Sequence, residues 1–411
     1  MGDILHYAVS GAFGAGTRIA FALHPDGLGH YRQGPSTLVV VNHRRDSDSI
    51  IVPPLLIFNG VRPIRPMWFA GREDMFCTGF LGLQAPFPDA LRRLLVHTNL
   101  TRVLHALHIL PIRRFPERTR REAVEEFISA LADPPAEQVL APREVEVLAA
   151  LGLRGGKVSD ILGWRYRRWW WEQTSLRVFL PQWRDRVAGT QRAAVDGQLR
   201  ALAAVLDRGD ALYVAPEGVL SSDGRLQPFR AGFRRVLELV RVPVRYLPVG
   251  IVYDFMTRGR MRAFVAVGGE TPVIASPAVI ETEARRAVAA LQTMTVSQVA
   301  STVLWETAGR GEDTMAVAAL AAAVFERAAA LRDRGIRIDP ALFGRSRMER
   351  IAGYVGYLTR RGIALANGAE MLVDLPYLRR VPAVDRQNPV RYAVNELESV
   401  LAILSPAAES P

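Results

Sequence analysis

Short apolar runs alternate with helical patterns between Thr37 and about residue 275, and this alternation constrains the fold more than any other feature of the chain. Each run has four to seven residues and is bounded by turn residues, which is typical of buried strands. The segments between them carry apolar side chains at helical spacing. Strand alternating with helix predicts an α/β fold with a mixed, largely parallel sheet flanked by helices. The predicted strands are Thr37–Val41, Met67–Ala70, His108–Ile112, Ala211–Ala215, Tyr246–Val252 and Phe264–Val267.

The composition changes at both ends and in the middle of the chain. Residues 1–32 are rich in glycine and alanine and predict a helix that lies in a membrane interface. Residues 33–275 form the predicted α/β domain, with an insertion at 116–192. Beyond about residue 275 no further strand is predicted, and residues 276–411 read as an Ala- and Arg-rich helical tail. No segment reaches the ~20 apolar residues that a membrane-spanning helix needs.

The positive charge of the chain is concentrated in one segment. The 52 Lys and Arg exceed the 41 Asp and Glu by a net charge of +11, and residues 154–192 hold nine basic against three acidic residues. The same segment contains five of the seven tryptophans. We expect it to bind an anionic membrane surface, because basic groups attract the headgroups and tryptophan suits the interface. The alternative is that some of these tryptophans belong to the protein core.

The most informative motif, Asn42-His43-Arg44-Arg45-Asp46-Ser47-Asp48, follows the first predicted strand. His43 stands on the turn, and Asp48 lies five residues on, in the first turns of a helix. A carboxylate at that spacing can hold one imidazole nitrogen while the other nitrogen faces an open site. Histidine suits general-base catalysis because its ordinary pKa is near neutrality. The alternative is a surface histidine with Asp46 as a helix N-cap.

Three further motifs lie on or after predicted strands. Pro216-Glu217-Gly218 leaves the strand at 211–215, where a glycine lets backbone approach a ligand closely or simply begins a turn. Arg113 and Arg114 end the strand at 108–112, where paired arginines can also be an ordinary solvated face. Leu247-Pro248-Val249 carries no chemical group and by itself indicates core. Open α/β sheets place their sites at the carboxyl ends of strands, and this is where the polar motifs fall.

Taken in order, the four motifs resemble the four blocks of the glycerolipid acyltransferase family, the 1-acylglycerol-3-phosphate and glycerol-3-phosphate O-acyltransferases. The blocks of that family read N-H-x4-D, G-x-x-x-I-x-R, P-E-G-T-R-S and a proline-containing hydrophobic strand. The resemblance covers about residues 35–270. The chain departs from the family at Val219-Leu220, which replaces Thr-Arg, and at His108, which replaces the glycine of the second block.

The resemblance implies transfer of a fatty acyl group from acyl-CoA or acyl-carrier protein to a hydroxyl of glycerol-3-phosphate or 1-acylglycerol-3-phosphate, in phospholipid biosynthesis. The single cysteine, Cys77, and the lack of a convincing signal peptide or spanning segment lead us to expect a peripheral protein on the cytoplasmic face of the cell membrane. His43 would be the general base, and Asp48 would orient it and stabilise its charged form. The acyl thioester is a co-substrate, so no separate cofactor and no metal are expected.

The resemblance also implies an acceptor site. Arg114 would bind the acceptor phosphate, with Arg113 as its neighbour. Glu217 and Gly218 would shape the acceptor pocket. We expect Arg230 to help replace the arginine that is missing at position 220.

Two alternatives stay open. The chain could acylate an unphosphorylated lipid alcohol, since Leu220 replaces a phosphate-binding arginine. It could also be a non-catalytic basic module that binds lipid headgroups or, through arginines interleaved with tryptophans, nucleic acid. A binding module has no need of His43 and Asp48 at opposite ends of a turn, so the sequence favours an enzyme and does not favour a nucleic-acid partner.

Overall fold

The computed structural model describes residues 2–60, 65–80, 82, 91, 95, 98–113, 118–131, 133–170, 172–367, 369–380 and 387–405. The chain forms two compact units. The first unit comprises residues 1–70, 105–109 and 203–411, and the second comprises residues 71–104 and 110–202. The predicted insertion therefore falls within the second unit, whereas the N-terminal segment and the tail belong to the same unit as most of the sheet.

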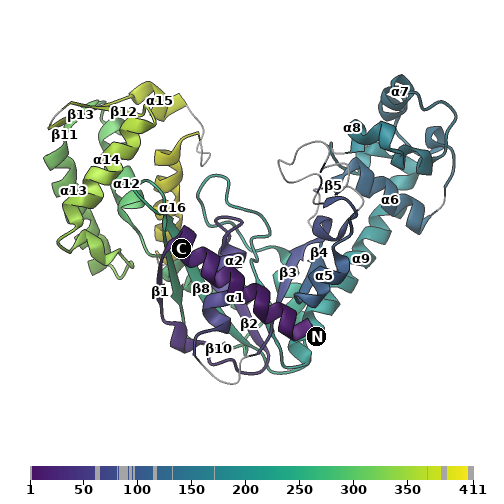
Figure 1. The fold of residues 1–411 in the computed structure, drawn as a ribbon, viewed down its shortest axis with the longest axis horizontal. Coiled ribbons are helices and arrows are strands. Elements are labelled where there is room, and N and C mark those ends of the chain that lie inside the picture. The colour runs from purple at the N-terminus through teal and green to yellow at the C-terminus, as the bar shows by residue number, and fades with distance from the viewer. Residues whose placement is uncertain are drawn as a thin grey trace, which may run out of the picture. The chain divides into compact units, whose positions relative to one another are not determined.

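The strands of the main sheet are β1 Ala22–Asp26, β2 Thr37–Val41, β3 Met67–Arg72, β4 Ile109–Ile112, β7 Ala211–Val214, β8 Arg245–Asp254, β9 Arg262–Val267 and β10 Thr271–Pro272. Their order is β1-β9-β8-β2-β7-β3-β4, with β10 paired to β8 (Figure 1). The pairs of β2 with β7 and β8, of β3 with β7 and of β1 with β9 are parallel. Strand β8 runs antiparallel to β9. This mixed, largely parallel sheet confirms the predicted fold class.

All six predicted strands are present, but the sequence did not indicate β1. Its five residues, Ala-Leu-His-Pro-Asp, are half-buried or exposed and show no strand-like alternation. They form a strand because they pair with β9 at the edge of the sheet. Local pattern cannot reveal a pairing that depends on a partner about 240 residues later in the chain.

Helix α2, Asp48–Ile57, lies directly against the sheet, because all of its residues from Ile51 to Ile57 are buried. The N-terminal helix α1, Gly2–Ala20, packs on α2 and confirms the predicted N-terminal helix. Further helices flank the sheet: α9 Pro181–Asp207, α10 Ala231–Leu239 and α11 Pro277–Ala290. No helix within the described residues is long and apolar enough to cross a membrane.

Helix α1 turns polar side chains toward the protein and apolar ones away from it. His6 and Thr17 are buried, whereas Ile4 and Ile19 are 74% and 75% exposed. The ring of His6 stacks on that of His108 at 4.7 Å between centroids, and His108 stacks in turn on Trp68 at 4.6 Å. Burial and the neighbouring His108 lower the pKa of His6 to about 4, so this ring is neutral at pH 7. The apolar surface of α1 is left to face solvent or a membrane.

The tail contains strands, and the expectation that strands stop after residue 275 is wrong. Strands β11 Thr314–Ala316, β12 Ala364–Asn367 and β13 Glu370–Val373 form an antiparallel sheet in the order β11-β13-β12. Each has only three or four residues, too few for alternation to stand out from an Ala-rich background. The helices around them are α12 Val296–Gly309, α13 Val317–Asp333, α14 Arg347–Arg360, α15 Leu375–Arg380 and α16 Pro389–Leu404.

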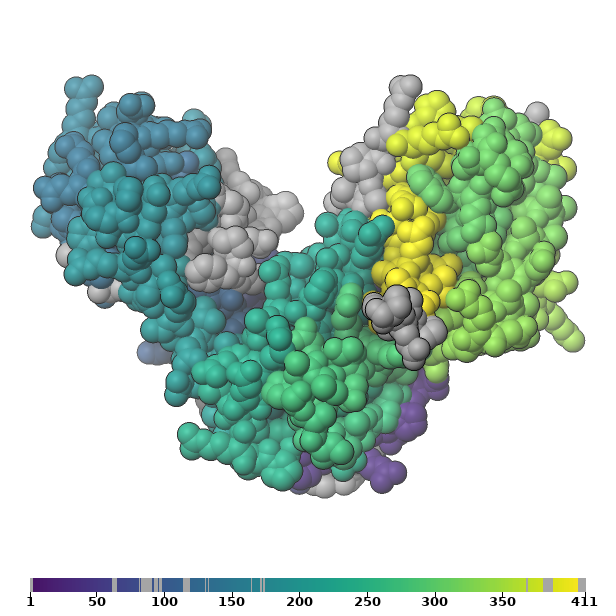
Figure 2. All heavy atoms as spheres, turned by 180° about the vertical axis from the view of Figure 1, so that it is seen from behind, coloured from purple at the N-terminus to yellow at the C-terminus, as the bar shows by residue number. Residues whose placement is uncertain are grey.

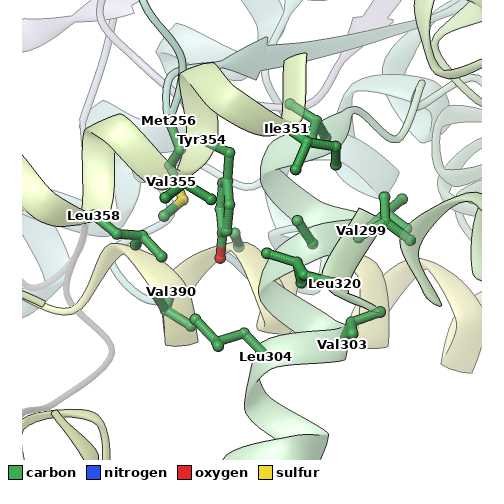
Figure 3. Close-up of a cluster of buried hydrophobic side chains, with 14 of the residues drawn as sticks. Met256, Val299, Val303, Leu304, Leu320, Ile351, Tyr354, Val355, Leu358 and Val390 are labelled. Atoms are coloured by element: carbon green, nitrogen blue, oxygen red, sulfur yellow. The ribbon is translucent and has the colours of Figure 1, made fainter. Parts of the chain in front are cut away.

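These helices pack around a separate hydrophobic core, in which the fully buried Tyr354 lies among aliphatic side chains (Figure 3). The Tyr354 and Ser301 hydroxyls lie 3.1 Å apart, so the phenol keeps a hydrogen bond inside the core. Val390 of α16 belongs to the same cluster. The C-terminal helix is therefore an integral part of the tail rather than an appendage.

The second unit is built from the first part of α5 Thr101–Ala106, β5 Arg118–Thr119, α6 Arg120–Ala130, α7 Pro142–Ala150, α8 Arg167–Trp170, β6 Gln173–Thr174 and the first part of α9. Its core includes Phe127, Phe179, Trp169 and Trp170. The indole N–H of Trp169 donates to Glu144 Oε2 at 2.8 Å, and that of Trp170 donates to the Ile161 carbonyl at 2.5 Å.

The alternative for the basic segment thus holds for Trp169 and Trp170, which are core residues. Trp183 is half-buried, and its indole N–H donates to the Gln138 carbonyl. Trp171 and the side chain of Trp164 lie outside the described residues. Arg165, Arg167 and Arg168 are exposed, so the positive charge of this segment does lie at the surface.

Candidate active site

His43 and Asp48 meet at the carboxyl end of β2. Asp48 is the first residue of α2, and its Oδ2 lies 3.2 Å from Nδ1 of His43. The carboxylate is fully buried, while 15% of the His43 side chain is exposed. With Nδ1 held by the carboxylate, the second ring nitrogen, Nε2, is the one left to exchange a proton with a bound molecule.

The Asp48 carboxylate is fixed from several sides. Its Oδ2 also accepts the backbone N–H groups of Arg44 at 2.6 Å and Arg45 at 2.9 Å. Its Oδ1 accepts the hydroxyl of Tyr253, near the end of β8, at 2.6 Å. Burial, reinforced by the charge of Asp48, raises the pKa of Tyr253 far above its usual range, so the phenol stays a proton donor. Such a carboxylate can hold the imidazole in one orientation.

Glu217 follows β7, the strand next to β2, and reaches the same turn. Its Oε1 accepts the backbone N–H of His43 at 2.6 Å, and its Oε2 accepts that of Gln227 at 2.7 Å. Burial raises the pKa of the Glu217 carboxyl, while the nearby Arg44 and the two N–H donors act in the opposite direction. Glu217 thus fixes the backbone of the turn at His43 through a hydrogen bond to its N–H.

Gly218 and Arg230 lie together beside Glu217. Gly218 has a φ of +71°, and a Cβ added to it would lie 3.0 Å from Cγ of Arg230. The Arg230 Nε–H donates to the carbonyl of Glu217 at 3.2 Å. Glycine is therefore required for the backbone conformation here, and Arg230 contacts the backbone of the Glu217-Gly218 turn.

His43, Asp48, Glu217, Gly218 and Arg230 all belong to the first unit. Arg113 belongs to the second unit, where its guanidinium contacts Glu73 at 2.5 Å and Glu126 at 2.6 Å. A phosphate at Arg113 would have to compete with these two carboxylates. Arg114 lies outside the described residues. His108, the departure from glycine in the second block, has a φ of +60°, in the left-handed region that glycine prefers.

The structure adds contributors that the motif reading did not assign. The side chain of Asn42 donates to the carbonyl of Ile251 and accepts its N–H, which joins the end of β2 to β8. Tyr253 lies two residues beyond Ile251 on β8, and its hydroxyl donates to Asp48. Both contacts follow from the parallel pairing of β2 with β8. The sequence could predict that the two strands belong to one sheet, but not which residues lie opposite one another.

Comparison of the chain with models of protein families and with curated proteins finds no match. Among the described residues, no group of three or more His, Cys, Asp or Glu side chains is arranged to hold a metal ion. The geometry of the site is that of a partly exposed imidazole held by a buried carboxylate that accepts several hydrogen bonds. Such an imidazole can exchange a proton with a bound molecule.

Proposed function

We propose that the protein is an O-acyltransferase that moves a fatty acyl group from acyl-CoA or acyl-carrier protein to a hydroxyl of glycerol-3-phosphate or 1-acylglycerol-3-phosphate. The observation that carries the proposal is the contact between Nδ1 of His43 and the buried Asp48 at the end of a central strand. The resemblance of the four motifs to the glycerolipid acyltransferases supports it and supplies the substrate class.

The reaction needs no covalent intermediate between substrate and protein, because a thioester is already activated. Nε2 of His43 takes the proton of the acceptor hydroxyl as the oxygen attacks the thioester carbonyl. The carbon–sulfur bond then breaks, and the leaving thiolate takes the proton back. Asp48 stabilises the imidazolium in between, as an opposite charge at hydrogen-bond distance does. The rate acceleration comes from placing the acceptor hydroxyl against the thioester and from stabilising the charge that develops in the transition state.

A second acceptor class has its own support. Arg113 is engaged by Glu73 and Glu126, and Leu220 stands where the family has arginine, so the chain has fewer cations committed to a phosphate than the family pattern implies. An unphosphorylated lipid alcohol is therefore the competing acceptor. We favour the phosphorylated acceptors, because the second block keeps the isoleucine and the arginine of the family pattern, at Ile112 and Arg114.

The test is an acceptor screen with the purified full-length chain. Release of free thiol from long-chain acyl-CoA, or from acyl-carrier protein, is measured with glycerol-3-phosphate, 1-acylglycerol-3-phosphate and unphosphorylated lyso-lipids, and the acylated product is identified by mass spectrometry. We expect thiol release only when a phosphorylated acceptor is present. Turnover of unphosphorylated acceptors alone would establish the second class, and no acceptor-dependent release from either donor would refute the acyltransferase.

We also propose that the protein works as a peripheral protein on the cytoplasmic face of the cell membrane. Two surfaces support this. Helix α1 exposes Ile4 and Ile19, which suits insertion into an interface. The exposed Arg165, Arg167 and Arg168 suit anionic headgroups.

Vesicle binding separates these two contributions. We expect Ile4→Ser combined with Ile19→Ser to weaken binding to anionic vesicles about tenfold at any salt concentration, because apolar burial is lost. Reversal of Arg165, Arg167 and Arg168 to Glu should weaken binding mainly at low salt, where charges are least screened. Sedimentation with vesicles measures both. Ile274→Ser, at a 91% exposed isoleucine outside α1, is the matched control, and equal binding by all variants would exclude both surfaces.

A further inference from the structure

Arg44, the residue after His43, carries a buried guanidinium whose partners come from distant parts of the chain. The side chain is 4% exposed. Its Nη1 donates to the carbonyl of Gly224 at 2.5 Å, and its Nη2 donates to Gln292 Oε1 at 2.6 Å. Its Nε lies 3.6 Å from Oε1 of Glu396, on the C-terminal helix α16. A buried charge needs such partners, and α16 supplies the only full opposite charge among these three.

Helix α16 also holds the loop that leaves β7 after Glu217. The Asn395 side chain donates to the carbonyl of Asp223 at 2.8 Å, and the hydroxyl of Ser399 accepts the N–H of Leu226 at 3.1 Å. Between these contacts the loop passes so close to α16 that a Cβ on Gly224 would lie 2.2 Å from the Tyr392 carbonyl oxygen. In Figure 2, α16 is the yellow column between the green helices of the tail and the teal part of the same unit.

We propose that α16 is a positioning element of the active site, in which Glu396 sets the catalytic turn through Arg44 while Asn395 and Ser399 set the loop that carries Glu217. The proposal rests on the proposed function only in taking His43 as the catalytic group. Glu396 and Arg44 are positioning residues, because nothing places their side chains against a substrate.

The connection from α16 to the imidazole is short. The backbone N–H of Arg44 donates to the same Oδ2 of Asp48 that holds His43, so a shift of the Arg44 backbone moves a donor of that carboxylate. On the other side, the backbone N–H of Ser221 donates to the His43 carbonyl at 3.1 Å. The turn is thus held through Arg44 and through the loop at 221–226. Arg44 contacts Glu396 of α16, and the loop accepts and donates hydrogen bonds with Asn395 and Ser399 of the same helix.

The charge of Arg44 serves the same site. Burial alone would lower the pKa of Arg44, but Glu396 and other nearby acidic groups hold it above its ordinary value, so the guanidinium stays charged. That charge acts against the rise that burial causes in the pKa of Glu217. The two backbone N–H groups that donate to the Glu217 oxygens also favour its ionised form.

The experiment compares Glu396→Gln with Glu398→Gln, the same change on the same helix at an exposed residue that pairs with Arg391. We expect Glu396→Gln to lower kcat at least tenfold with the acceptor KM within twofold of wild type, since the turn and not the binding site is disturbed. Glu396→Asp should recover part of the loss. Glu398→Gln should stay within twofold in both constants.

Amide hydrogen exchange gives a readout that needs no activity. The N–H groups of His43, Arg44 and Arg45 are bonded to the Glu217 and Asp48 carboxylates, and we expect them to exchange at least tenfold faster in Glu396→Gln but not in Glu398→Gln. Unchanged exchange together with unchanged kcat would overturn the proposal.

The two proposals can fail separately. If the wild-type protein transfers no acyl group, the proposed function fails, and faster exchange at residues 43–45 still supports the role of α16. If Glu396→Gln does not fold, Asn395→Ala removes a bond to the Asp223 carbonyl without stranding a buried charge. Faster exchange at residues 217–227 in that variant supports the proposal, and unchanged exchange refutes it.

Discussion

We expect the replacement of His43 with alanine to lower the rate of the proposed acyl transfer on the order of 10²–10⁴-fold, because the acceptor hydroxyl would lose its proposed general base. Asp48→Asn also lowers the rate strongly, since the amide carries no charge to stabilise an imidazolium at the 3.2 Å contact. Both variants act on kcat more than on the KM of the acceptor. Steady-state kinetics with the best acceptor from the screen measures the effect.

His105→Ala, at an exposed histidine of α5, is the control and should retain wild-type turnover. Thermal unfolding confirms that each variant is folded. Retention of more than a tenth of wild-type turnover by His43→Ala in a folded protein contradicts the mechanism, whatever the effect of Asp48→Asn.

Replacing Trp169 with alanine lowers the free energy of unfolding of the second unit by about 3–5 kcal/mol, the usual cost of removing a large aromatic side chain from a core. The indole is 1% exposed, and its N–H holds Glu144, which also contacts Arg120 at 3.0 Å. The variant loses both the packing and a hydrogen bond to a buried acid. Urea unfolding, followed by circular dichroism, gives the change in free energy.

Trp169→Phe separates the two losses. It keeps an aromatic ring and removes the N–H, so we expect it to cost about 1–3 kcal/mol. A loss below about 1 kcal/mol in Trp169→Ala would mean that the indole is not part of the core.

The centre of the sheet was predictable because β2, β7, β8 and β9 are buried on both faces. Runs such as Leu38–Val41 have no polar residue, and the sequence on either side changes to helical spacing, so type and position were both visible. The edge strand β1 and the short strands of the tail lack this contrast. They form through pairing with segments remote in sequence, which local pattern does not report.

Part of the candidate site was predictable for a similar reason. His43 and Asp48 are five residues apart, so a single turn brings them together, and Glu217 follows a strand that pairs directly with β2. The link from Arg44 to Glu396 spans most of the chain and has no sequence signal. The burial of Trp169 also had no sequence signal. An indole whose N–H has a hydrogen-bond partner is equally at home in a protein core and in a membrane interface.

The division of the chain into units fixes the order in which the protein can be completed during synthesis. The second unit has all of its residues once position 202 has been made, so it can fold while the rest is still being translated. The first unit must wait, because β2 is flanked by β7 and β8, and Arg44 by Glu396. At typical rates of translation, roughly 20–70 s separate the synthesis of His43 from that of Glu396. Through that interval the nascent chain holds an unfinished sheet, and the turn at His43 lacks the contacts that β7, β8 and Glu396 supply.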